Sequence, residues 1–296
     1  MAEINLHGIF PPITTPFIDG KIAYDKLEAN VERWSMTGIK GFVVLGSNGE
    51  SVYLSEDEKR EVVETVARSS PGEMQIIAGT GCESTKETLR LSRDCAERGA
   101  HAALVITPHF FGGKMSEEAL ERHYRVVADQ SPIPIILYNV PKFTHLNLTA
   151  NIISSLAHHP NIIGIKDSAG NVNQLGDFLN HVEGDFSVLV GAAGVLYSGL
   201  TLGCSGGILA LANVAPEPCV KIFDLVQEGR FEEARALQLM MIPVNKAVTA
   251  TYGIGGLKAA MDMLSYFGGE PRLPLLPSTE AEKSEIRKIL NKAGLL

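Results

Sequence analysis

The chain is poor in the features that mark several large classes of protein. Four of its 296 residues are cysteines, and they are Cys82, Cys95, Cys204 and Cys219. None forms a C-x-x-C pair, so we expect reduced thiols rather than a disulfide framework. No H-E-x-x-H, G-x-S-x-G or nucleotide-binding glycine motif occurs, and no paired Asp/His set indicates a metal site.

Basic clusters and long apolar runs are also missing. The formal net charge is -8, and no cluster of five basic residues occurs, so nucleic acid is not an expected partner. No apolar stretch has the length of a membrane span, and the first residues lack the basic and apolar regions of a secretory signal. We therefore expect a cytoplasmic protein that does not bind a membrane.

The sequence does contain a regular alternation of short β-like runs and longer amphipathic segments. The predicted strands are 8–14, 41–45, 75–78, 102–106, 133–138, 162–166, 187–190 and 207–210. Most are separated by about 25–35 residues, the length of one βα unit. Short, continuously apolar strands are typical of a parallel sheet covered on both faces. The pattern predicts an α/β protein with a (β/α)8 TIM barrel, and an open doubly wound sheet is the alternative that strand counting leaves open.

Beyond residue 215 the strand pattern stops, and a C-terminal helical extension is predicted. Its helices are expected at 216–228, 231–248, 256–267 and 279–293. Within the barrel, Ser55 with Glu58 forms a capping box that opens a helix over 56–68. The predicted division is a barrel with the active site over 1–220 and a helical region over 221–296.

Lys166 ends the apolar run Ile162-Ile163-Gly164-Ile165 and is followed at once by polar residues. An ammonium at the end of a buried strand is costly. Partial desolvation lowers the pKa of an amine, and the neutral form can attack a carbonyl. The structural alternative is a lysine whose ammonium reaches solvent beside the strand end.

Tyr138 ends the preceding predicted strand and is expected to lie next to Lys166. Neighbouring strands are about 4.8 Å apart, so the two side chains can meet at the mouth of the barrel. A phenol beside an amine can transfer protons during imine formation and carbon–carbon bond cleavage. The alternative for Tyr138 is a strand-end aromatic whose hydroxyl reaches the surface.

The loop Gly46-Ser47-Asn48-Gly49 follows the second strand. Its backbone N–H groups and small polar side chains can bind an anion such as a substrate carboxylate. The alternative is an ordinary turn, because these residues favour turns. Active sites of such barrels lie at the C-terminal ends of the strands, so Ser168 and Gly191, after the sixth and seventh strands, complete the predicted substrate-binding set.

These motifs together resemble those of the dihydrodipicolinate synthase / N-acetylneuraminate lyase superfamily of pyruvate-dependent class I aldolases. The matching segments are Gly46-x-x-Gly49-Glu50, Tyr138-Asn139-x-Pro141 and Gly164-Ile165-Lys166-Asp167-Ser168, in that order and spacing. The resemblance spans nearly the whole chain. It implies a barrel with a C-terminal helical region that self-associates as a homotetramer or dimer.

The resemblance also implies the chemistry of the site. Lys166 would form a Schiff base with pyruvate or another small 2-oxo acid, Tyr138 would transfer protons, and Ser47-Asn48 would bind the carboxylate. No metal or organic cofactor is expected, since the covalent imine with Lys166 supplies the electron sink.

Within the superfamily, the chain looks most like the 4-hydroxy-2-oxoglutarate aldolase branch. The resembling segments are Gly46-Ser47-Asn48-Gly49-Glu50, Met115-Ser116-x-x-Ala119-Leu120, Ser131-Pro132-Ile133-Pro134 and Gly253-Ile254-x-Gly256-Leu257-Lys258. This branch cleaves 4-hydroxy-2-oxoglutarate to pyruvate and glyoxylate. The alternatives are a 2-keto-3-deoxy sugar acid aldolase, a 4-hydroxy-tetrahydrodipicolinate synthase and a non-catalytic 2-oxo acid binding protein.

Three segments depart from the pattern of the dihydrodipicolinate synthases. Those enzymes usually have Thr-Thr in place of Ser47-Asn48, and an arginine for the aldehyde's carboxylate near Phe143. The family also commonly has a tyrosine, after Thr107-Pro108, that reaches the neighbouring subunit's site. Here the segment is His109-Phe110-Phe111. A phenylalanine has no proton to pass, so water or His109 would substitute, the relay would be shorter, or the reaction would differ.

Overall fold

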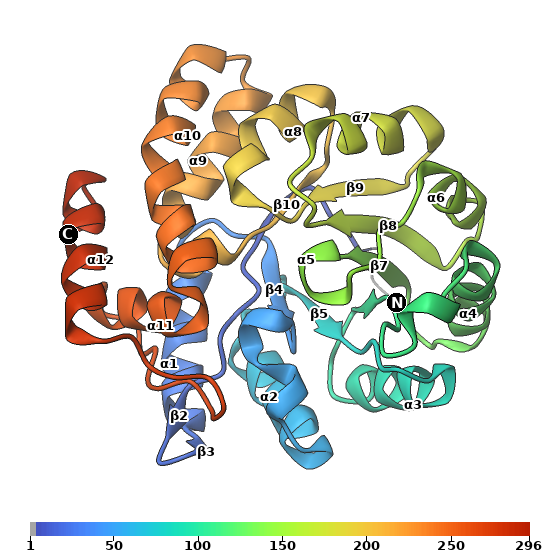
Figure 1. Ribbon diagram of the computed structural model, residues 1–296, viewed down its shortest axis with the longest axis horizontal. Helices are drawn as coiled ribbons and strands as arrows, with labels where there is room; N and C mark the ends of the chain where they lie inside the picture. Colours follow the sequence, from blue (N-terminus) through green and yellow to red (C-terminus); the bar gives the residue numbers. More distant parts are fainter. Residues whose placement is uncertain (1–3) are drawn as a thin grey trace.

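The computed structural model describes residues 4–296, and a barrel of parallel strands lies at its centre (Figure 1). The strands, in chain order, are β1 Gly8–Phe10, β4 Gly41–Val44, β5 Gln75–Gly79, β6 Ala102–Ile106, β7 Ile135–Asn139, β8 Ile162–Asp167, β9 Ser187–Val190 and β10 Gly206–Ile208. From β4 to β10 each strand pairs with the next one along the chain, and β10 also pairs with β1. All eight predicted strands are confirmed.

Backbone hydrogen bonds between the first two barrel strands close the sheet. The Val43 N–H donates to Pro11 O, and the Ile13 N–H donates to Val43 O, each at 2.9 Å. This closure excludes the open doubly wound alternative. The first strand ends at Phe10 instead of residue 14, because Pro11 and Pro12 have no N–H to continue a regular ladder.

Helices surround the barrel, and a small antiparallel hairpin, β2 Phe17–Ile18 with β3 Lys21–Ile22, follows β1. The helices up to residue 227 are α1 Tyr24–Ser35, α2 Glu56–Ser69, α3 Thr85–Ala96, α4 Glu117–Gln130, α5 Pro141–Thr144, α6 Ala150–Ala157, α7 Val172–His181, α8 Leu196–Leu202 and α9 Pro216–Gln227. The predicted capping box is present: the Ser55 hydroxyl accepts from the Glu58 N–H, and the Glu58 carboxylate accepts from the Ser55 N–H.

The C-terminal extension consists of α10 Phe231–Lys246, α11 Gly253–Met263 and α12 Glu280–Lys292. In Figure 1, α10 runs beside α9, and α11 and α12 lie together near α1. The α10 helix ends two residues before its predicted end and passes into a π-helical turn, Ala247–Thr251, one turn after Pro243 removes a backbone donor. Within the described residues, the structure has no helix with the length and hydropathy needed to cross a bilayer.

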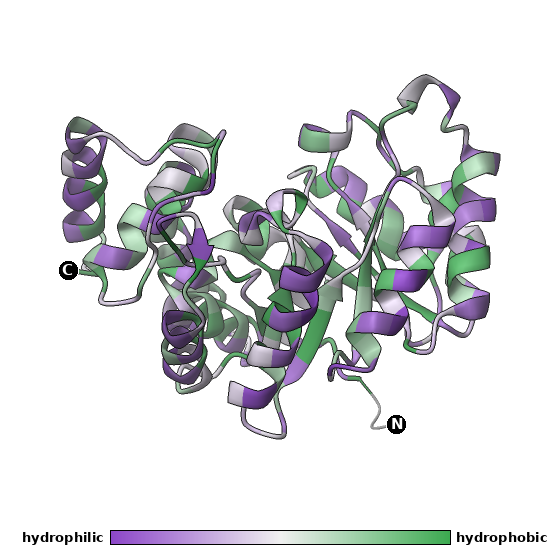
Figure 2. Ribbon diagram, turned by 90° about the horizontal axis from the view of Figure 1, so that it is seen from below, coloured by the Kyte–Doolittle hydropathy of each residue, from purple (hydrophilic) through white to green (hydrophobic). Residues whose placement is uncertain are grey.

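Two apolar layers hold the architecture together. A small cluster that includes Phe10, Leu104, Ile136 and Leu189 fills the barrel interior. A much larger cluster lies between the strands and the surrounding helices, where Trp34 is fully buried. Figure 2 shows the same division, with hydrophobic strands inside and hydrophilic residues on the outer helix faces.

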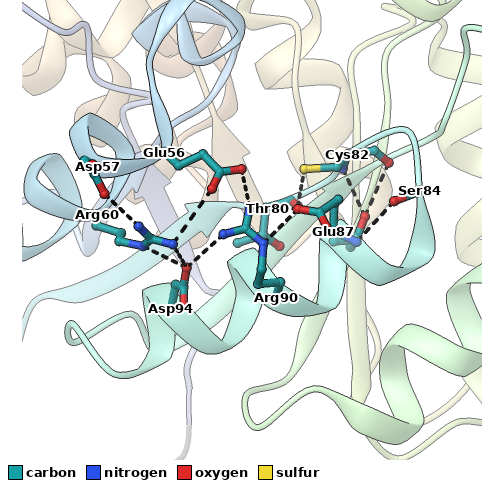
Figure 3. A network of polar contacts seen from close by, with 10 residues as sticks. Glu56, Asp57, Arg60, Thr80, Cys82, Ser84, Glu87, Arg90 and Asp94 are labelled. Carbon is teal, nitrogen blue, oxygen red and sulfur yellow. Dashed lines mark hydrogen bonds and ion pairs between the residues drawn. The ribbon is translucent and has the colours of Figure 1, made fainter.

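On the outside, an ion network joins α2 to α3 (Figure 3). Arg60 binds Asp94 at 2.7 Å and Asp57 at 2.8 Å, while Arg90 pairs with Glu56 and with Glu87. Because several of these charges share partners on two helices, the network fixes the spacing of α2 and α3 better than an isolated surface pair would.

Candidate active site

Lys166 and Tyr138 lie side by side at the C-terminal ends of neighbouring strands. The register of β7 against β8 pairs Tyr138 with Lys166 and Asn139 with Asp167. The Lys166 Nζ is 4.2 Å from the centroid of the Tyr138 ring. Both side chains are buried, with 3% exposure for Lys166 and 6% for Tyr138. The predicted juxtaposition is therefore present, and the alternative of a lysine reaching solvent is wrong.

The surroundings of Lys166 favour its neutral amine. Burial lowers the pKa of Lys166, and the nearby Tyr138 opposes this with a smaller effect. Among the described residues, no carboxylate raises the pKa of Lys166. The ammonium form therefore has little to offset the cost of its desolvation. An amine in this environment is available as a nucleophile at a lower pH than an ordinary lysine.

The loop that follows β4 approaches the same pair of residues. Ser47 Oγ is 3.5 Å from the Tyr138 hydroxyl, which joins the predicted carboxylate loop to the predicted proton-transfer group. Ser47 to Gly49 form one 3-10 turn after the extended Gly46, and both Ser47 and Asn48 remain partly exposed. A small ligand at the barrel mouth can therefore reach both side chains.

Non-glycine residues in left-handed conformation flank this loop. Leu45 has φ of 60° and Glu50 has φ of 55°. Such conformations cost about 1–3 kcal/mol each and persist where the surroundings impose them. Gly79 on β5 leaves room for the left-handed Leu45, since a Cβ at position 79 would lie 2.3 Å from the Leu45 carbonyl oxygen. The backbone therefore stores strain at the loop that the sequence assigns to substrate.

The two remaining substrate-binding candidates, Ser168 and Gly191, contact each other. The Gly191 N–H donates to Asp167 O at 2.6 Å, and a Cβ at Gly191 would lie 2.1 Å from Ser168 Oγ. Only glycine at position 191 lets the Ser168 hydroxyl stand beside the end of β8. Both residues are partly exposed and follow strands adjacent to the Lys166 amine, yet the roles of all six candidate binding residues stay predictions.

Sequence reasoning missed a partly buried polar network behind the ends of β7 and β8. Asn139 Nδ2 donates to Asp167 Oδ1 at 2.7 Å and to Asn147 Oδ1 at 2.8 Å. Gln174 Nε2 donates to Asp167 Oδ1 at 2.9 Å. Burial raises the pKa of Asp167. This network fixes the ends of β7 and β8. The sequence feature that could have predicted it is the polar residue directly after each catalytic candidate.

The segment that stands in place of the family's relay tyrosine contacts Glu83. Glu83 accepts from the N–H groups of His109 and Phe110 at 3.0 and 2.9 Å, and its other oxygen lies 3.0 Å from His109 Nδ1. The imidazole is therefore engaged with Glu83. Phe110 and Phe111 meet edge to face and are 77% and 69% exposed.

A surface concavity lies at the opposite end of the barrel from Lys166. Its volume is about 700 Å³, and its lining includes His101 before β6 and Pro134 before β7. It contains none of the candidate site residues. Among residues 4–296, no group of three or more His, Cys, Asp or Glu side chains is arranged to hold a metal ion.

A closed (β/α)8 barrel with a buried amine against a phenol at its C-terminal mouth is the arrangement expected of a Schiff-base aldolase. The model of the Dihydrodipicolinate synthetase family matches residues 5–293, and the chain belongs to that family. It is therefore a pyruvate-dependent carbon–carbon lyase or synthase, as the resemblance implied.

Named relatives match over almost their whole length. The 4-hydroxy-tetrahydrodipicolinate synthase of Methanothrix thermoacetophila is 37% identical over 287 residues, which cover 96% of each chain. The synthase of Methanococcus maripaludis strain C7 is 35% identical over 292 residues, which cover 98% of this chain and 100% of that protein.

Solved structures agree in fold. The dihydrodipicolinate synthase of Acinetobacter baumannii, solved in complex with pyruvate, has a TM-score of 0.94 at 30% identity and covers 99% of this chain and 100% of that one. The Thermotoga maritima enzyme has a TM-score of 0.93 at 30% identity, with 98% and 99% covered. These names favour the synthase, which the sequence offered as an alternative, over the 4-hydroxy-2-oxoglutarate aldolase branch.

Proposed function

We propose that Lys166 forms an imine with the C2 carbonyl of pyruvate and that the chain joins this pyruvate to an aldehyde. The buried Lys166 amine against the Tyr138 ring carries the proposal. The names of the full-length relatives support 4-hydroxy-tetrahydrodipicolinate synthase as the first reaction to test.

In the proposed chemistry, the neutral Lys166 amine attacks C2, and the ketone oxygen leaves as water. Loss of a C3 proton from the imine gives an enamine, whose C3 forms a bond to the aldehyde carbon. The aldehyde oxygen takes a proton from Tyr138, directly or through water. Cleavage of a 4-hydroxy-2-oxo acid runs the same steps in reverse, so the iminium takes up the electrons of the C3–C4 bond. Ser47, Asn48 and the loop N–H groups bind the carboxylate of pyruvate.

A second candidate is the cleavage of a 4-hydroxy-2-oxo acid, and residue 143 supports it. Phe143 is 52% exposed on α5, and a phenyl ring gives a carboxylate on the aldehyde partner no charge to bind. The nearest cation on this helix is Lys142, whose Nζ is 5.5 Å from the Phe143 ring centroid. Glyoxylate also carries a carboxylate, so a neutral aldehyde from a 2-keto-3-deoxy sugar acid suits this ring better than either acidic partner.

The decisive experiment is a screen of aldehydes with pyruvate. Aspartate semialdehyde, glyoxylate and glyceraldehyde would be supplied separately, and product would be measured by mass spectrometry. The synthase proposal requires turnover with aspartate semialdehyde at the highest kcat/KM. Turnover with glyoxylate or glyceraldehyde alone would replace it with the aldolase, and imine formation without any turnover would indicate a 2-oxo acid binding protein.

Two variants on α5 identify the group that binds the aldehyde's carboxylate. Phe143→Arg adds a guanidinium and should raise kcat/KM for aspartate semialdehyde about tenfold or more, because a charge-assisted hydrogen bond contributes roughly 1.5–3 kcal/mol. The same variant should leave kcat/KM for glyceraldehyde unchanged, because this aldehyde has no carboxylate. Lys142→Met should lower kcat/KM for the acidic aldehyde if Lys142 already supplies the cation.

Self-association as a homotetramer or dimer is proposed as well. The exposed Phe110 and Phe111 rings support it, since an aromatic pair of this exposure is better covered by another protein surface. Light scattering on the purified chain measures the mass directly. The cytoplasmic location stays a prediction.

A further inference from the structure

A second buried lysine, Lys258 on α11, lies beneath the carboxylate loop. Its side chain is 0% exposed, and its Nζ is 2.6 Å from Glu50 Oε1. Glu50 directly follows the loop at 46–49, and its side chain is 1% exposed. An ion pair this deep joins the active-site loop to a helix more than two hundred residues later in the chain.

The same ammonium holds a second point of the loop through Thr15. Lys258 Nζ donates to Thr15 O at 2.8 Å, and the Thr15 hydroxyl donates to Gly49 O at 2.7 Å. The backbone of Gly49 and the carboxylate of Glu50 are therefore both tied to one buried cation. Its remaining partner is Glu270 O at 3.0 Å, so the charge is satisfied within the protein.

A third tie comes from the segment after α11. The Arg272 N–H donates a hydrogen bond to Glu50 Oε2 at 2.7 Å, while Oε1 is held only by its ion pair with Lys258. Lys258 and Arg272 also sit against the Phe17 ring, at 4.5 and 4.4 Å from its centroid. Figure 1 shows α11 and the chain that follows it beside α1 and the β2–β3 hairpin.

The loop needs such an anchor because its two ends are strained. Leu45 and Glu50 are left-handed although neither is glycine. A free Glu50 would relax toward an ordinary conformation and turn Ser47 and Asn48 with it. Since Ser47 Oγ is 3.5 Å from the Tyr138 hydroxyl, a small rotation of the loop would separate the carboxylate site from the catalytic pair.

We propose that Glu50 and Lys258 are positioning residues, which hold the 46–49 loop in the geometry that binds the carboxylate of pyruvate. This inference rests on the proposed function of the same site. If Lys258 positions the loop, the C-terminal region contributes to pyruvate binding, although Lys258 itself does not contact the substrate.

The test measures how imine trapping by borohydride depends on pyruvate concentration. No aldehyde is needed, so the result does not depend on which reaction the enzyme catalyses. Glu50→Gln should raise the half-saturating pyruvate concentration at least tenfold, while the fraction of protein trapped at saturation stays that of the wild type. A merely structural role would lower the folded fraction and leave the half-saturating concentration unchanged.

Asn30→Ala is the matched control. Asn30 Nδ2 donates to Phe267 O, and Asn30 Oδ1 accepts from the Phe267 N–H, each at 2.8 Å. This buried side chain ties the C-terminal region to α1 without touching the loop. Asn30→Ala should lower Tm and leave the half-saturating pyruvate concentration within twofold of the wild type.

Three outcomes would overturn the inference, and they are distinguishable. If Glu50→Gln traps pyruvate with the wild-type concentration dependence, the positioning role fails and the proposed function stands. If Glu50→Gln does not fold, the double variant Glu50→Gln/Lys258→Met removes both charges and must show the same tenfold loss. Failure of both to fold assigns the pair a structural role only. A wild type that traps no pyruvate refutes the proposed function itself.

Discussion

The surroundings of the two buried lysines differ in one respect that decides what each can do. Lys166 and Lys258 are 3% and 0% exposed, and each ammonium lies against an aromatic ring, at 4.2 Å from Tyr138 and 4.5 Å from Phe17. Burial lowers the pKa of both. Lys258 has a carboxylate at 2.6 Å and two carbonyl acceptors, whereas Lys166 faces a phenol.

This difference separates a charge-compensated cation from a candidate nucleophile. The charge of the Lys258 ammonium is compensated by Glu50 and by two carbonyl oxygens, so it stabilises the arrangement of the loop, and a protonated nitrogen has no lone pair for nucleophilic attack. Lys166 is desolvated without a carboxylate, which favours the neutral amine. A buried lysine is thus a candidate nucleophile when its partners leave the charge uncompensated, and burial alone does not distinguish the two cases.

The largest expected effect is the loss of all turnover in Lys166→Met. The substitution removes the proposed nucleophile and replaces a buried amine that has no carboxylate partner with an apolar side chain, so Tm should stay the same or rise. Both imine trapping and product formation should disappear. Full activity in this variant, or in Lys166→Ala or Lys166→Arg, would exclude Lys166 as the nucleophile.

The matched change, Lys258→Met, should lower stability and, because Lys258 holds the 46–49 loop through Glu50 and Thr15, also raise the half-saturating pyruvate concentration. It leaves Glu50 as an uncompensated buried carboxylate, which costs about 3–5 kcal/mol. Thermal unfolding should show a Tm several degrees below that of the wild type. An unchanged Tm would mean that the ion pair does not stabilise the fold and would weaken the contrast between the two lysines.

Tyr138→Phe should separate imine formation from proton transfer. Positioned acid–base groups contribute about 10²–10⁴-fold, so kcat should fall by that range. The pyruvate adduct on Lys166 should still be trapped. If kcat is unchanged, Tyr138 does not transfer the proton, and its ring serves only to pack against the amine.

The smallest effect is a shift in pH dependence. Because burial lowers the pKa of Lys166, the rate of imine trapping should rise with pH to a midpoint below about 10.4, the value of an ordinary lysine. Tyr138 raises the pKa of this amine, so Tyr138→Phe should move the midpoint further down. A midpoint that moves up, or one at the ordinary value, would contradict the assigned environment.

The barrel could be predicted from the sequence because its strands are short apolar runs with a regular spacing, a local property of the chain. Lys166 and Tyr138 could be paired for the same reason, since adjacent strand ends have a fixed separation. The Glu50–Lys258 pair could not, because nothing local relates residues 208 positions apart. The sequence feature that could have indicated this pair is the lysine within the apolar, glycine-rich start of α11. The division of the chain at residues 220 and 221 stays a prediction.

The most direct test of this account is to incubate the protein with pyruvate, reduce it with borohydride and map the modified peptide. The comparison of the two buried lysines predicts an adduct on Lys166 and none on Lys258. An adduct on Lys258, or no adduct in a folded protein, would contradict it.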